Sequence, residues 1–142
     1  MFAMFQSAFA FNKPLNHWNV SNVTNMKHMF ADATVFNQNI NRWDVSNVKD
    51  MSYMFSYTKA FNQPLSFDIS SVINMKRMFY YAKEFTKKHN NDKPLPNETD
   101  DIKKWFNLNR DKMNEIDIQN NHGKDIEDFF SIFDKKSKEM NK

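Results

Sequence analysis

The sequence MKHMFADATVFN, residues 26–37, decides the predicted fold because related segments recur along the chain. They begin at Met1, Met51 and Met75, so the periods are 25, 25 and 24 residues. Each segment carries apolar or small side chains at positions 0, 3, 4, 7 and 10, counted from its first Met. That spacing is typical of one face of an α-helix of about three turns. The sequence therefore predicts four repeat helices that share an apolar face.

A second motif lies between the helical segments. Apolar and polar residues alternate over three positions, and this period of two predicts a short strand with one buried face. The motif occurs three times, as Trp18-Asn19-Val20, Trp43-Asp44-Val45 and Phe67-Asp68-Ile69.

Polar residues flank the predicted helices. A short side-chain oxygen at the residue before a helix can accept a bond from its free N–H groups. This N-cap role is predicted for Asn25, Asp50 and Asn74. The residue after a helix often adopts the left-handed conformation, which Asn tolerates. This second role is predicted for Asn12, Asn37 and Asn62.

These elements predict an α/β solenoid over residues 1–86, with four repeat helices and three short parallel strands. The polar residues 87–98, with two prolines, are interpreted as a linker. Residues 99–142 are expected to form a helical hairpin with a turn at 120–123, which caps the last repeat. The alternative is that the hairpin docks on a partner, with a set of aromatic side chains as its anchors. Those anchors would be Trp105, Phe129, Phe130 and Phe133.

The repeat pattern N-x-P-L-x-x-W-x-V-S-N-V-x-x-M-x-x-M-F-x-x-A-x-x-F-N resembles the BspA-type leucine-rich-repeat surface proteins. The variant is one from wall-less bacteria, long described as a domain of unknown function. Asn12-Lys13-Pro14-Leu15, Met29-Phe30 and Phe36-Asn37 carry the resemblance, with their equivalents in the next two copies. The resemblance implies a leucine-rich-repeat-like solenoid, display on the cell surface, and a role in adhesion and host interaction.

Composition argues against several kinds of chemistry. The chain has no Cys, so thiol catalysis is excluded, and its single Gly, at position 123, cannot build a phosphate-binding loop. The four His residues occur singly, without metal-binding spacing. We therefore expect no enzyme activity, no cofactor and no metal. The net charge of +3 comes without a basic stripe, so no nucleic-acid partner is expected. No apolar run of about 18 residues is present to span a membrane.

One surface is a candidate binding site. Because helices are wider than strands, stacking should leave the strands on the concave side of the solenoid. Polar positions that point outward from the strands would line that face: His17, Asn19, Arg42, Asp44, Ser66 and Asp68. Three of these, Asn19, Asp44 and Asp68, could bind a cation or instead pair with Arg42. The recurring Ser21, Ser46 and Ser70 predict a ladder of hydrogen bonds beside them.

The predicted function is that of a non-catalytic module for protein–protein interaction or adhesion. The partner would be a host protein or a second copy of the chain. No signal peptide is recognisable, so the cell-surface location follows from the resemblance alone. Because the chain starts inside a repeat, we also expect an exposed apolar edge at the first repeat that favours homo-oligomers. The alternative is a truncated structural remnant of a longer surface repeat protein, with no independent activity.

Overall fold

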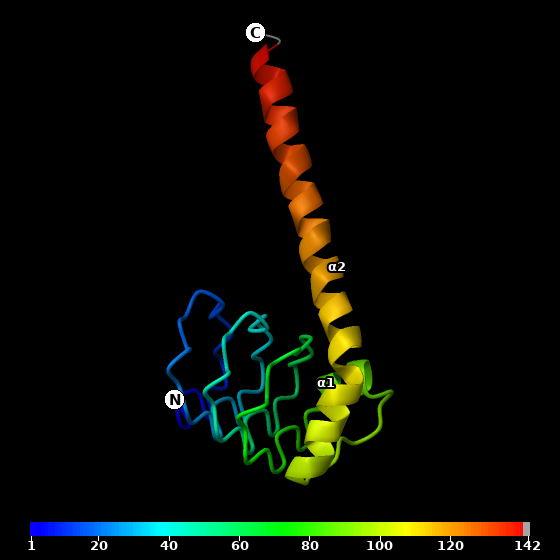
Figure 1. Ribbon diagram of the computed structural model, residues 1–142. Coiled ribbons are helices and arrows are strands. Elements are labelled where there is room, and N and C mark those ends of the chain that lie inside the picture. Colours follow the sequence, from blue (N-terminus) through cyan, green and yellow to red (C-terminus); the bar gives the residue numbers. More distant parts are fainter. Residues whose placement is uncertain (141–142) are drawn as a thin grey trace.

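The computed structural model describes the backbone of residues 1–140 and the side chains of residues 1–121. Its two helices are α1, Lys83–His89, and α2, Thr99–Met140. Before them the chain winds through successive loops that lie side by side (Figure 1). We call these loops rungs: rung 1 is residues 1–25, rung 2 is 26–50, rung 3 is 51–74, and the partial rung 4 is 75–82.

The rungs are built from consecutive β-turns. In rung 2 the N–H of Ala31 donates to the carbonyl of His28, three residues earlier, at 3.1 Å. The N–H of Phe30, one residue before Ala31, donates instead to the carbonyl of Met54 in rung 3, at 3.0 Å. The two kinds of bond alternate from His28 to Ala33, so each N–H of this stretch is satisfied either within its own turn or by the next rung.

These turns place the same two positions of every rung in the left-handed region. At positions 2 and 6, φ lies between 52° and 60°. The residues are Ala3, Ser7, His28, Asp32, Tyr53, Tyr57, Arg77 and Tyr81. A right-handed helix needs φ near about −63° at every residue, so the four predicted repeat helices do not form. The apolar spacing is met by turns that repeat every four residues.

The three predicted strands are also wrong. The N–H of Trp43 donates to the Ile40 carbonyl at 3.1 Å, so this segment is a turn and does not join a ladder. Parallel pairing is confined to two isolated bridges, Asn25 with Asp50 and Asp50 with Asn74. Residues 1–140 therefore contain two helices and no strand, which overturns the predicted leucine-rich-repeat-like α/β solenoid with its three parallel strands.

Two columns of phenylalanine rings form the core of the rungs. At position 4, neighbouring rings are stacked with centroids 5.5–5.7 Å apart: Phe5, Phe30, Phe55 and Phe79. At position 10, centroids lie 5.9–6.0 Å apart: Phe11, Phe36, Phe61 and Phe85. The apolar face predicted for rung 2 is buried as a set, although it does not belong to a helix. Full burial of one such side chain is worth about 1.5–3 kcal/mol.

An asparagine column runs beside the core. The side-chain oxygen of Asn12 accepts from the N–H of Asn37 at 2.9 Å, and that of Asn37 accepts from the N–H of Asn62 at 3.0 Å. Nε2 of the buried His89 donates to the Asn62 carbonyl at 2.8 Å and ends the column. These Asn residues do not have left-handed φ. They link rungs, and the predicted helix-ending role is wrong.

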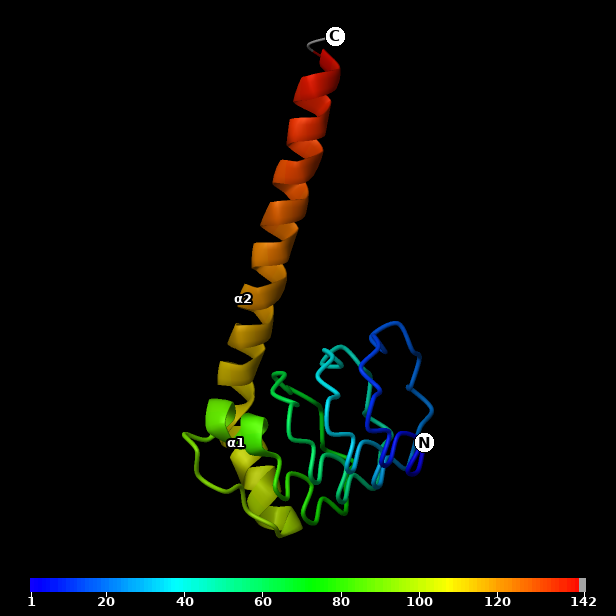
Figure 2. The same cartoon turned by 180° about the vertical axis from the view of Figure 1, so that it is seen from behind.

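The first half of α2 closes the last rung. The ring centroids of Trp105 and Phe106 lie 6.3 and 5.9 Å from that of Phe79, and both side chains are buried. Farther along, the sulfur of Met113 accepts from the Leu65 N–H at 3.5 Å. The second half of α2 extends away from the rungs (Figure 2).

The region after the rungs differs from its predicted division. The helix α1 begins at Lys83 and extends into the predicted linker 87–98. The helix α2 continues through residues 120–123, where a turn was predicted, so the predicted hairpin is one helix. A Gly within a helix costs only about 1 kcal/mol relative to Ala, so Gly123 does not prevent the helix from continuing. The predicted anchors Phe129, Phe130 and Phe133 lie outside the side chains that the structure describes.

Candidate binding surface

The six predicted binding residues are not gathered by a sheet. His17, Asn19, Arg42, Asp44 and Asp68 are exposed, whereas Ser66 is half-buried. The N–H of Ser66 donates to the side-chain oxygen of Asn41 at 2.6 Å, and the Asn41 amide donates to the Ser66 hydroxyl at 3.0 Å. Ser66 therefore holds rungs 2 and 3 together.

The acidic residues of this set are bonded to their own turns. Oδ1 of Asp44 accepts from the N–H and the hydroxyl of Ser46, at 3.0 and 2.6 Å. These bonds lower the pKa of Asp44, although the nearby Asp68 charge opposes the effect. Bonds from Ser70 likewise lower the pKa of Asp68. The serines thus bond within single turns and not in the predicted ladder between repeats.

The cation site proposed for this set is not assembled. Among the described residues, no three His, Cys, Asp or Glu side chains are grouped to hold a metal ion. Asp68 lies instead in a hollow of about 270 Å³ with the basic Lys103 and Arg110 of α2. The Arg110 charge also lowers the pKa of Asp68. The predicted pairing with Arg42 is replaced, at Asp44, by the bonds to Ser46.

A cluster of tyrosines, which the sequence analysis missed, lies on rungs 3 and 4. The Tyr57 centroid is 5.7 Å from that of Tyr80 and 5.3 Å from that of Tyr81. Tyr80 and Tyr81 are 4.5 Å apart, and the Arg77 guanidinium carbon lies 5.0 Å from the Tyr80 centroid. Tyr57 is 41% exposed and Tyr81 is 59% exposed. We call these four residues the tyrosine surface.

The turn geometry explains why the rings of Tyr57 and Tyr81 face solvent. Tyr57 and Tyr81 occupy position 6 and Arg77 occupies position 2, the left-handed positions that point away from the core. The sequence carried a signal for this surface. Aromatic residues recur at positions outside the apolar face in SYMFSY, residues 52–57, and RMFYY, residues 77–81.

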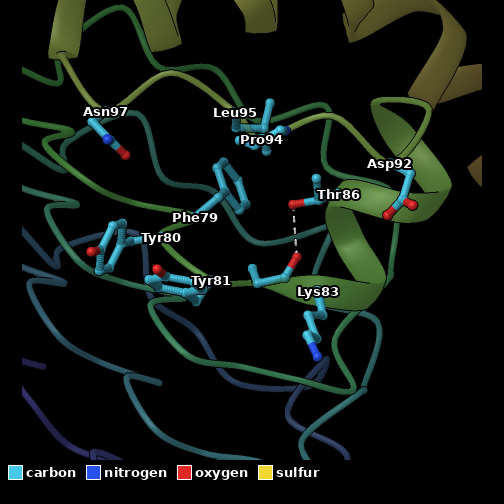
Figure 3. Close-up of a pocket in the computed structure, with 10 residues that line it drawn as sticks. Phe79, Tyr80, Tyr81, Lys83, Thr86, Asp92, Pro94, Leu95 and Asn97 are labelled. Carbon is cyan, nitrogen blue, oxygen red and sulfur yellow. Dashed lines mark hydrogen bonds between the residues drawn. The ribbon is translucent and has the colours of Figure 1, made fainter.

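A pocket of about 330 Å³ adjoins the tyrosine surface. Rung 4, α1 and the loop at 90–98 surround it, with Tyr80 and Tyr81 on one side of Phe79 and Pro94 and Leu95 on the other (Figure 3). The rest of its lining is mostly polar: Ala82, Lys83, Thr86, Asp92 and Asn97. The volume is at the lower end of the range for ligand pockets, about 300–1,000 Å³.

The tyrosine surface also has a distinct electrostatic character. Desolvation and the neighbouring Tyr81 and Tyr57 raise the pKa of Tyr80, and the Arg77 charge partly opposes this. The phenol therefore stays protonated at neutral pH and can both donate and accept hydrogen bonds. The surface combines flat aromatic faces, neutral hydroxyl groups and one cation. Such a set suits binding through stacking and hydrogen bonds.

The architecture is thus a stack of β-turn rungs with phenylalanine columns, closed at one end by a helix. The chain belongs to the family described as "Mycoplasma protein of unknown function, DUF285", which matches residues 1–93. No curated protein and no solved structure matches the chain. Within the described part of the chain, neither helix is both long and apolar enough to cross a membrane.

Proposed function

We propose that the protein is a non-catalytic module for protein–protein interaction, and that the tyrosine surface is its contact site. The observation that carries the proposal is the grouping of three tyrosines and one arginine on adjacent rungs, with the rings of Tyr57 and Tyr81 exposed. Tyr and Arg are the residues most enriched at the energetic centres of protein interfaces. The pocket beside the surface offers a place for a partner's anchoring side chain.

The backbone beneath the surface favours tight contacts. The N–H of Tyr57 donates to the carbonyl of Tyr80 at 2.8 Å, so the two rungs that carry the rings are directly bonded. A tyrosine has only two side-chain torsions to fix on binding, and a rigid support lowers the ordering cost further. The surface is therefore suited to recognition without a large conformational change.

The location and the kind of partner rest on the resemblance to BspA-type surface proteins. That resemblance supports a place on the cell surface and an adhesive role, with a host protein or a second copy of the chain as the partner. The tyrosine surface lies within residues 1–93, the part of the chain that matches the family.

A site-specific cross-linking experiment tests the proposal. A photo-reactive phenylalanine derivative would replace Tyr81 in one variant and the exposed Lys13, on rung 1, in a matched control. We expect one defined protein to be captured from position 81 and not from position 13. The captured protein, once purified, should bind Tyr81→Ser about 30-fold more weakly than the unaltered chain, as for the truncation of an interface hot spot.

Three results would contradict the proposal. Equal capture from both positions would mean that the tyrosine surface is not a selective contact. Unchanged affinity for Tyr81→Ser, with an unchanged melting temperature, would remove the surface from the interface. Absence of any captured protein would favour a purely structural role.

A further inference from the structure

The backbone bonds between the first turns of neighbouring rungs follow one rule. The N–H groups at positions 2, 4 and 6 of a rung donate to the carbonyls at positions 1, 3 and 5 of the next rung. From rung 3 to rung 4, for example, Phe55 donates to Met78 at 2.9 Å and Tyr57 donates to Tyr80 at 2.8 Å. The same pattern joins rung 1 to rung 2 and rung 2 to rung 3. A fifth rung would therefore accept from rung 4 in the same register.

The segment that follows α1 replaces only part of a fifth rung. At position 0, the N–H of Met75 donates to the hydroxyl of Thr99 at 3.0 Å. At position 2, the N–H of Arg77 donates to the carbonyl of Asn97 at 2.8 Å. The first half of rung 4 is thus satisfied by residues 97–99.

The second half of rung 4 is open. Within residues 1–121, the N–H groups of Phe79 and Tyr81, at positions 4 and 6, have no hydrogen-bond acceptor. Both residues line the 330 Å³ pocket, so there is space in front of this backbone (Figure 3). Trp105 and Phe106 cover the Phe79 ring but supply no acceptor to its N–H. Both donors are therefore free to bond to a ligand that supplies carbonyls, and each such hydrogen bond contributes about 0.5–1.5 kcal/mol.

We propose that this edge binds a peptide segment of a partner in the turn conformation of a rung, which adds to rung 4 as a fifth rung would. Two of its carbonyls, two residues apart, accept from the N–H groups of Phe79 and Tyr81. This inference rests on the proposed function, because the peptide would lie directly beside Tyr80 and Tyr81. It is a form of recognition in which main-chain bonds give affinity and a pocket gives specificity.

The structure also specifies the residue between the two carbonyls. In the rungs this residue is the position-4 phenylalanine, which stacks on the ring of the preceding rung. On rung 4 that stacking place is already taken by Trp105 and Phe106. The bound peptide therefore needs a small residue, Gly or Ala, at its centre.

A peptide suits the pocket better than a small anion does. The two donors are separated by a full residue, which matches alternate carbonyls of a rung, as Met29 and Ala31 show for rung 1. Phe79, Pro94 and Leu95 give the pocket apolar walls, which would desolvate a free carboxylate or phosphate at a cost. Lys83 and Asp92 both line the pocket, so they give it no net charge.

Backbone amide NMR on the full chain tests the inference. The probe is a capped peptide of residues 26–32 with Phe30→Ala, because the Met29 and Ala31 carbonyls of that segment accept such bonds from rung 1. In the free protein, we expect the amides of Phe79 and Tyr81 to exchange with solvent far faster than their equivalents in rung 3. Saturating peptide should slow both by about tenfold or more, as a new hydrogen bond would.

Each control has a defined meaning. The same peptide with Phe30 retained should bind more weakly, and equal binding would overturn the predicted small central residue. Exchange at Phe79 and Tyr81 as slow as at Phe55 and Tyr57 in the free protein would show that the edge is closed. If acetate slowed the exchange of the two amides as much as the peptide does, the site would bind a carboxylate and the inference would be overturned. It would also be overturned if millimolar peptide left the exchange of both amides unchanged.

The test separates this inference from the proposed function. A partner that is captured at Tyr81 and lost in Tyr81→Ser, yet leaves the Phe79 and Tyr81 amides unprotected, would keep the tyrosine surface and refute the edge. Protection of the two amides by the peptide, with no partner captured at Tyr81, would keep the edge and refute the tyrosine surface as the contact.

Discussion

The left-handed positions lead to a prediction with opposite signs for two identical substitutions in rung 1. Ala3 has φ of 52°, whereas Ala10 is outside the left-handed region. Replacing Ala3 by Gly removes a steric cost of about 1–2 kcal/mol. It also adds unfolded-chain entropy worth about 0.4–1 kcal/mol. Ala3→Gly should therefore stabilise the fold by roughly 0.8 kcal/mol and at most by about 1.6 kcal/mol, and Ala10→Gly should destabilise it by about 0.4–1 kcal/mol.

The bond from the Ala3 N–H to the Lys27 carbonyl, at 2.9 Å, is retained in the Gly variant, so the backbone term is isolated. Urea unfolding followed by far-UV circular dichroism and tryptophan fluorescence measures the change. Trp18 lies 5.6 Å from Phe5 and reports on rung 1 itself. Equal destabilisation by both substitutions would refute the left-handed conformation at Ala3, and with it the turn structure of the rungs.

Three further predictions follow from the core, a buried histidine and the exposed arginine. Phe55 is fully buried between two stacked rings, so Phe55→Ala should lower the free energy of unfolding by about 3–5 kcal/mol in urea titrations, enough to unfold a marginal variant. Burial lowers the pKa of His89 from 6.5, so the unfolded chain takes up this proton first. Stability should therefore be full above that value and fall as the pH drops below it, and His89→Gln should flatten the pH dependence of the melting temperature. Arg42 is exposed, so Arg42→Glu should change the free energy of unfolding by less than about 0.5 kcal/mol. If the surface predicted from the sequence, which includes Arg42 and Asp44, contacts the partner, Arg42→Glu weakens binding to that partner. A large loss of stability would instead make Arg42 structural.

The sequence predicted which residues are buried better than it predicted their conformation. In rung 2, Met26, Met29, Phe30, Ala33 and Phe36 are all fully buried, as their spacing required. The same spacing suits a helix of period 3.6 and a run of turns of period four, and over about eleven residues the two differ little. The helix and the run of turns differ in φ at positions 2 and 6. Gly usually marks left-handed residues in a sequence, and this chain has only one Gly.

The candidate site was harder to foresee for a related reason. Once the repeats were interpreted as helices and strands, Asp44 and Asp68 became outward strand residues that were free to act together. In the structure each accepts bonds from a serine two residues later, so both belong to local turns. The open edge at Phe79 and Tyr81 depends on which rung bonds lack a successor, and no sequence pattern contains that information.

The repeated register of the bonds between rungs has a consequence for how such a chain can change length. Because neighbouring rungs bond through the same set of positions each time, a whole period can be gained or lost without changing the register of the remaining bonds. Rung 3 shows where smaller changes are tolerated. It is one residue shorter between Leu65 and Phe67 than rung 2 is between Ile40 and Trp43, yet the bonds from rung 3 to rung 4 keep their register. Duplication of entire units would therefore lengthen the stack of rungs, while its end at α2 and the open edge at Phe79 and Tyr81 stay the same.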